Sequence, residues 1–158
     1  MPKLRRFFST LLIVMVFGVI APLFADNASY TPDPEITARI ASDPSIIKSK
    51  LISSMNKILE NPATLTIELT PVDDEHTARG RFKKIEVFTS RGSIDNLTLN
   101  RADIDFEDVQ LDTRKLLEEE KIDPVSMSNI NMDVSILESD LNAFLESKSK
   151  SIKVDRPR

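Results

Sequence analysis

The stretch Thr64-Leu65-Thr66-Ile67-Glu68-Leu69-Thr70 alternates polar and apolar residues without interruption. A period of two places all three of its apolar side chains on one face of a strand. Threonine and isoleucine are β-branched and pack well on a pleated surface, so the composition agrees with the period. The stretch therefore predicts a strand with one buried face, and the rest of the chain must provide a partner for that face.

A second strand is predicted over residues 80–89. Its apolar side chains are divided between two faces, with Ile85 and Val87 on one and Phe82 and Phe88 on the other. Residues 71–78 are mostly polar and predict a turn, so the two strands are expected to form an antiparallel hairpin. This second strand is therefore predicted to carry apolar side chains on both faces of the sheet.

Two more β regions follow, over residues 97–112 and 126–137. In the first, Ala102, Ile104 and Phe106 share one parity, whereas Val109 and Leu111 share the other. Such a change predicts a β-bulge, which bends a sheet. The second region alternates regularly, and its apolar face carries Ile130, Met132, Val134 and Ile136. Short helices are predicted over 113–120 and from 138 or 139 onward.

The region before the first strand predicts helices. Asp33-Pro34-Glu35 has an N-cap residue, a proline at the first helical position and an acidic first turn. We expect one helix over 34–41 and a longer one over 44–60, with Pro44 kinking or separating them. Apolar residues recur at helical spacing on one face of the longer segment, namely Ile47, Leu51, Met55, Ile58 and Leu59. The predicted fold class is α+β: a long N-terminal amphipathic helix packed on a strongly curved antiparallel sheet.

Residues 1–25 have the organisation of a signal peptide. Three basic residues precede the apolar run 11–20, and Pro22 and Ala25 suit a cleavage site. We predict a signal peptide at 1–25, a linker at 26–32 and a single domain at 33–158. The predicted location is the periplasm or the exterior of the cell envelope. The alternative is an uncleaved anchor in the inner membrane, because residues 7–25 are almost long enough to span it.

The charge and composition of the exported part exclude several function classes. Removing the three basic residues of the signal leaves 18 Lys and Arg against 25 Asp and Glu, a net charge of −7. Nucleic-acid binding is therefore not expected, because it requires a basic surface. The sequence has no cysteine and only three glycines. Thiol chemistry and glycine-rich phosphate loops are accordingly excluded.

Two groups of residues are candidates for catalysis or metal binding. His76, the only histidine, lies in a polar turn and is expected to be a solvated loop residue. Asp103, Asp105 and Glu107 alternate with apolar residues and are expected on a solvated strand face, although carboxylates can bind Ca²⁺. We predict no catalytic residue, no metal site, no cofactor and no enzymatic activity.

Several segments resemble a known family. The similar segments, in order, are 80–87, 94–99, 102–104, 109–112, 116–117, 134–136 and 140–145. Together they resemble the LmeA-type bacterial phospholipid-binding family over roughly residues 35–146. The resemblance implies an envelope protein whose fold is related to the tubular lipid-binding domains of bactericidal/permeability-increasing protein. It implies phospholipid binding and no catalytic residue.

The family usually continues with further strands after the helix that begins near Asp140. Compared with the family, the chain is therefore expected to be a C-terminally truncated domain, a naturally shorter relative or half of a dimeric barrel, and its own barrel of this type would be incomplete. An open sheet edge would result, and such an edge invites pairing with another chain, for example in a homodimer.

We therefore expect an exported protein that binds phospholipid or another acyl-chain lipid in an apolar groove between helix and sheet. Lipid transfer, support of envelope glycolipid biogenesis and contact with a membrane surface are expected roles. The alternative is a structural or interaction module with a solid core, because a core and a groove need the same aliphatic surface. The predicted lining residues are Ile47, Leu51, Met55, Ile58, Leu65, Ile67, Leu69, Ile85, Val87, Ile104, Phe106, Ile130, Met132, Val134 and Ile136.

Overall fold

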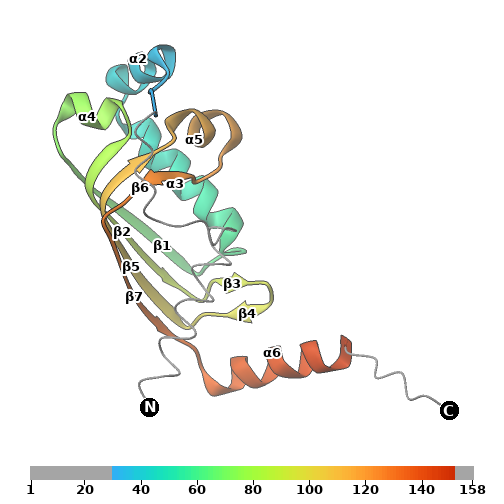
Figure 1. Cartoon of the computed structure of the whole chain (residues 1–158). Coiled ribbons are helices and arrows are strands. Elements are labelled where there is room, and N and C mark those ends of the chain that lie inside the picture. Colours follow the sequence, from blue (N-terminus) through green and yellow to red (C-terminus); the bar gives the residue numbers. More distant parts are fainter. Residues whose placement is uncertain (1–29, 152–158) are drawn as a thin grey trace.

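The computed structural model describes residues 30–151 and shows an α+β fold with a curved, unclosed antiparallel sheet (Figure 1). The sheet order is β1-β2-β5-β6, and β7 also pairs with β5. Its strands are β1 (Thr64–Pro71), β2 (Arg81–Ser90), β5 (Arg101–Leu111), β6 (Pro124–Ser126) and β7 (Asn129–Ser135). The predicted signal peptide lies outside the described residues.

A small second sheet and five helices complete the described part of the chain. The hairpin consists of β3 (Ser93–Ile94) and β4 (Leu97–Thr98). The helices are α2 (Pro34–Ser42), α3 (Ser45–Ile58), α4 (Asp74–Ala78), α5 (Thr113–Glu119) and α6 (Glu138–Ser151). Within residues 30–151, no helix is both long and apolar enough to cross a bilayer.

The expected long N-terminal helix is not supported, because the described region contains two shorter helices. The Asp33 carboxylate caps α2 and accepts hydrogen bonds from the backbone N–H groups of Glu35 (2.9 Å) and Ile36 (3.2 Å). The chain then breaks at Asp43-Pro44, so Pro44 separates the helices. The longer helix, α3, has 14 residues and is followed by Glu60 and Asn61, both at positive φ.

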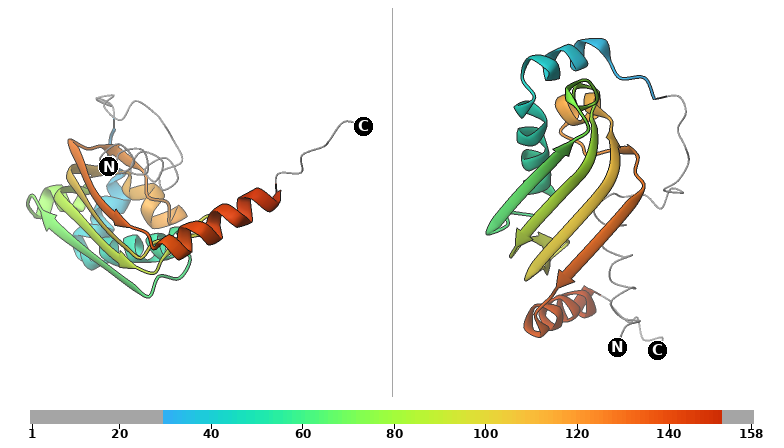
Figure 2. Two further views of the ribbon diagram at one scale, coloured as in Figure 1. Left: turned by 90° about the horizontal axis from the view of Figure 1, so that it is seen from below. Right: turned by 90° about the vertical axis from the view of Figure 1, so that its left-hand side faces the viewer.

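The core lies between one face of the sheet and the elements α3, α5 and β3–β4, which all lie on that side (Figures 1 and 2). The opposite face carries the acidic residues predicted to be solvated. Asp105 there forms an ion pair with Lys84, with 3.4 Å between oxygen and nitrogen. The sheet is therefore two-sided, with one apolar face and one charged face.

The predicted change of parity in the third β region occurs at Asp108, whose φ is +49°, but it is not a β-bulge against β2, because the β2–β5 register does not shift. Asp108 and its neighbour on β2, Lys83, are both left out of the β2–β5 pairing. The pleat therefore changes parity in both strands, and Phe82 is buried on the same face as Ile85. The prediction that Phe82 shares the outer face with Phe88 is wrong for this reason.

Three predicted boundaries also differ from the structure. The polar turn over 71–78 contains the helix α4, which Asp73 caps through its side chain. Residues 97–98 belong to the small hairpin, so the third strand begins only at Arg101. The strand predicted over 126–137 begins only at Asn129 and ends at Ser135, whereas Ser126 is the last residue of β6; between them the backbone N–H of Ser128 bonds to Glu107 O at 2.9 Å.

Candidate functional site

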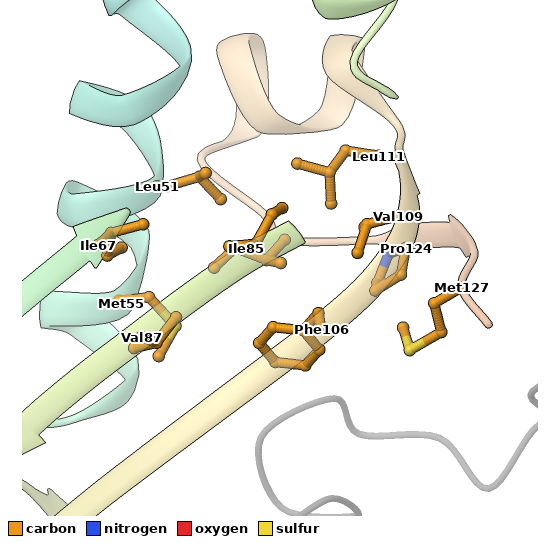
Figure 3. Close-up of a pocket in the computed structure, with 11 residues that line it drawn as sticks. Leu51, Met55, Ile67, Ile85, Val87, Phe106, Val109, Leu111, Pro124 and Met127 are labelled. Carbon is orange, nitrogen blue, oxygen red and sulfur yellow. The ribbon is translucent and has the colours of Figure 1, made fainter. Parts of the chain in front are cut away.

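An apolar cavity lies between α3 and the sheet (Figure 3). Its volume is about 30 Å³ and its eleven lining residues are all hydrophobic. They are Leu51 and Met55 of α3, Ile67 of β1, Ile85 and Val87 of β2, Phe106, Val109 and Leu111 of β5, and Ile122, Pro124 and Met127. This volume is about that of one water molecule in the liquid. In this conformation the space beneath α3 is a nearly filled core.

The apolar face continues from the cavity to the edge strand β7. In the β5–β7 register, Phe106 lies opposite Ile130, and Ile104 lies opposite Met132. Directly opposed residues of an antiparallel pair share a face. The β7 side chains are only half-buried, unlike those of β5. Among the described strands β7 pairs with β5 alone, so the apolar surface reaches an open edge.

The structure brings six of the fifteen predicted lining residues to the cavity: Leu51, Met55, Ile67, Ile85, Val87 and Phe106. Two others, Ile47 and Ile104, are buried in the surrounding core. The remaining seven are partly buried at its margins: Ile58, Leu65, Leu69, Ile130, Met132, Val134 and Ile136.

Five cavity residues were missed by the sequence analysis: Val109, Leu111, Ile122, Pro124 and Met127. The parity change in 97–112 carried the signal for the first two, because it returns Val109 and Leu111 to the face that Ile104 and Phe106 occupy. The last three lie in a non-periodic segment around the short strand β6. No repeating pattern marks such a segment as buried.

An ionic cluster, which we call the Glu120 clasp, links α3 to the C-terminal end of α5: Glu120 with Lys50, Ser53 and Lys57 of α3. Lys50 Nζ lies 2.8 Å from Glu120 Oε1, and Ser53 Oγ donates to Oε2 at 3.2 Å. Lys57 Nζ also bonds to Oε2. Hydrogen bonds and charge from Lys50 and Lys57 lower the pKa of Glu120 from 4.5 to about 2. The carboxylate therefore stays ionised at all ordinary pH values.

A wider open cleft of about 520 Å³ lies between α2 and α4. Its lining mixes small apolar residues such as Ile40 and Ala78 with an ion pair between Arg79 and Glu75 at 2.8 Å. None of the predicted lining residues contributes to it. The charged rim makes it a poorer match for an aliphatic chain than the apolar face of the sheet.

His76 is placed on the short helix α4, where its Nδ1 lies 2.8 Å from Asp73 Oδ1. The Asp73 pKa is lowered, chiefly by the hydrogen bond from the His76 backbone N–H and also by the His76 side chain. Within the described part of the chain, no three His, Cys, Asp or Glu residues gather as a metal site. The arrangement at His76 is that of an exposed helix cap.

Comparison with known proteins places the sheet within one family. A family model described as LmeA-like phospholipid-binding matches residues 59–156, more than half of the chain. The match begins at the end of α3, later than the resemblance inferred from the residues, and extends beyond α6. The searches of curated proteins and of solved structures found no match. The family match confirms the resemblance, and the chain belongs to the LmeA-like phospholipid-binding family.

Proposed function

We propose that this protein binds a phospholipid, or another acyl-chain lipid, on the apolar face of its sheet. The observation that carries the proposal is the continuous apolar surface from the cavity beneath α3 to the half-buried side chains of β7. Nearly all of that surface belongs to residues 59–156, which match the family of lipid-binding proteins. The driving force would be hydrophobic, at ~0.8 kcal/mol for each CH₂ removed from water.

The small size of the cavity determines how a chain would bind. A bilayer already shields the acyl chains of a lipid from water. To compete with the bilayer, the protein must shield a comparable length of those chains. A cavity of about 30 Å³ cannot do this, because ligand pockets typically have ~300–1,000 Å³. An acyl chain would therefore lie along the half-buried apolar side chains of β7 (Ile130, Met132 and Val134). It would enter the space beneath α3 as the helix moves outward.

Helix α3 is suited to such a movement because the chain is irregular at both of its ends. The break at Asp43-Pro44 precedes it, and the left-handed residues Glu60 and Asn61 follow it. Most of the sheet residues that line the cavity beneath it are aliphatic, and such side chains can repack around a flexible chain. Met55, which lines the cavity, has an adaptable unbranched side chain.

A pair of charge insertions on the two faces of β7 tests this proposal. Met132→Glu places a carboxylate on the apolar face, whereas Ser135→Glu places one on the outer face opposite Arg101. Native mass spectrometry and lipid extraction of purified protein would be compared for wild type and both variants. We expect wild type and Ser135→Glu to carry lipid and Met132→Glu to lose it. A wild-type protein that is always lipid-free contradicts the proposal.

The proposed setting is the bacterial cell envelope, after export directed by residues 1–25. A role in lipid transfer or envelope glycolipid biogenesis, at a membrane surface, would use the same apolar face. The exported form should begin at Asp26, which intact-mass measurement of protein from an envelope fraction would show. A mass that retains residues 1–25 would instead support an N-terminal anchor.

A second candidate function is a structural or interaction module, and the small cavity volume favours it. Strand β7 is an open edge of seven residues that contains neither lysine nor proline. These are two of the residue types that protect natural edges from pairing. This candidate predicts lipid-free protein that forms a homodimer through β7. Light scattering at several protein concentrations would measure the mass.

A further inference from the structure

Three hydrogen-bond donors of α3 converge on one carboxylate. Lys50, Ser53 and Lys57 are three and four residues apart, so they follow one side of the helix. All three bond to Glu120, at 2.8 Å from Lys50 and 3.2 Å from Ser53. The side chains of Lys50 and Glu120 are 30% and 26% exposed, so solvent and ligands can reach the cluster.

The clasp joins the two walls of the apolar cavity. On α3, Leu51 and Met55 line the cavity from positions next to the clasp residues. On the opposite wall, Ile122 and Pro124 line it and follow Glu120 by two and four residues. The cluster therefore holds together two segments that both contribute lining residues, and separation of α3 from this segment would widen the space between them.

The chemistry of the three donors fits a phosphate group. Two ammonium groups and a hydroxyl donate to the two oxygens of one anionic carboxylate, and a phosphodiester also presents charged oxygens. Lysine binds phosphate as a point charge without a strict geometric requirement. The depressed pKa of Glu120 shows that this position stabilises negative charge. A phospholipid has a part for each of these features: an anionic headgroup for the three donors and apolar chains for the cavity.

We propose that Lys50, Ser53 and Lys57 form the subsite for the headgroup phosphate of a bound phospholipid, which Glu120 occupies while no lipid is bound. This inference rests on the proposed lipid binding. Entry of the lipid exchanges the Glu120 carboxylate for the phosphate, and Glu120 moves into solvent. The exchange replaces one anion by another on the same donors, so the charges of Lys50 and Lys57 stay compensated. The acyl chains then enter the widened space between the two segments.

The test compares two ligands with the same short acyl chains: phosphatidylglycerol, used as monomers, and the diacylglycerol that lacks the phosphate. The measured quantity is the ratio of their affinities for the full-length protein, called here the phosphate selectivity. We expect Glu120→Gln to raise this selectivity about fivefold or more, because it releases Lys50 and Lys57 from two ion pairs, each worth up to about fivefold when exposed. Lys50→Gln combined with Lys57→Gln should lower it about tenfold or more, because charge-assisted bonds to phosphate are lost.

Two neighbouring residues supply matched controls. Lys48 is an exposed lysine of α3, and Glu119 is an exposed carboxylate that precedes Glu120. Lys48→Gln and Glu119→Gln should leave the phosphate selectivity unchanged. If the double variant does not fold, Lys57→Gln alone takes its place in the test. The Lys57 side chain is 65% exposed, so this single substitution should not disturb folding. Circular dichroism and thermal unfolding would establish the folding of each variant.

The outcomes separate this inference from the proposed function. If wild type binds neither ligand, the proposed lipid binding fails. If both ligands bind and every clasp variant shifts their affinities equally, the clasp is only a structural link between α3 and α5, and the inference is overturned. Inorganic phosphate alone should not raise the melting temperature of Glu120→Gln. A shift equal to that with phosphatidylglycerol would assign the site to a free anion and also overturn the inference.

Discussion

Phe82 of β2 lies directly opposite Val109 of β5, and both side chains are buried in the core. Phe82 has the parity that faces outward from Lys84 onward in β2, and Val109 has the parity that faces outward up to Glu107 in β5. The change occurs where Lys83 and Asp108 are left out of the pairing and Asp108 adopts a φ of +49°. Because the same break occurs in both strands, they keep their register while the apolar face continues past it.

The two phenylalanines of β2 should differ strongly in their contribution to stability. Phe82 is 1% exposed in the core, whereas Phe88 is 38% exposed on the outer face, with its ring centre 5.5 Å from the Arg101 guanidinium. We expect Phe82→Ala to lower the free energy of unfolding by about 3–5 kcal/mol. Phe88→Ala should cost no more than about 1 kcal/mol. Urea denaturation measures both, and equal losses would contradict the assigned faces.

Gly80 should not accept a side chain. Its φ is +80°, and a Cβ at this position would overlap Thr113 Cγ2 and approach Leu111 O to 3.0 Å. We expect Gly80→Ala to lower the free energy of unfolding by more than about 2 kcal/mol, from backbone strain and overpacking together. The midpoint of urea denaturation would show the loss.

Thr113→Ser provides the control for this prediction, because it removes the overlapping methyl group and keeps the hydroxyl near Tyr30. The double variant Gly80→Ala, Thr113→Ser should recover part of the stability lost in Gly80→Ala. The backbone strain at position 80 should remain. Recovery to the wild-type value would show that steric overlap alone was responsible.

The Glu120 clasp should give the protein an acid-sensitive part of its stability. The pKa of Glu120 is about 2 in the folded protein and 4.5 ordinarily, so the unfolded chain binds more protons between these values. The contribution is therefore complete above about pH 4.5 and is lost as the pH falls towards 2. Glu120→Gln should remove it.

Urea denaturation of wild type and Glu120→Gln over this pH range measures the effect. The stability difference between them should decrease as the pH falls, because the clasp is lost in wild type also. Glu119→Gln serves as the control for removing one carboxylate nearby. A difference that stays constant from pH 7 to pH 2 would show that the pKa of Glu120 is not depressed.

The contribution of the α2 N-cap to the free energy of unfolding should be measurable by substituting Asp33. Its Oδ1 accepts hydrogen bonds from the backbone N–H groups of Glu35 and Ile36. Asp33→Ala should lower the free energy of unfolding by about 1 kcal/mol, because one cap acceptor is lost. Asp33→Asn keeps an acceptor and should restore most of this stability. An Asn variant as unstable as the Ala variant would indicate that charge, not capping, dominates.

Much of the fold could be predicted from local patterns. The alternation in 64–70 and the cap at Asp33 correspond to β1 and α2, because the period of side chains and the capping of free N–H groups act within a few residues. The six predicted residues that reach the cavity all belong to such regular segments. The apolar face and the family resemblance can therefore be predicted from the sequence alone.

Which apolar residues meet, and how much space remains between them, was decided only by the tertiary structure. The return of Phe82 to the core depends on a backbone break shared with another strand, and the pattern within one strand does not show it. The choice between groove and filled core depended on how closely α3 approaches the sheet. The Glu120 clasp joins residues about 70 positions apart in the chain. The sequence by itself determined the strands, the capped helix and the apolar face, because those depend on near neighbours, whereas packing distances and long-range ion pairs exist only after the chain has folded.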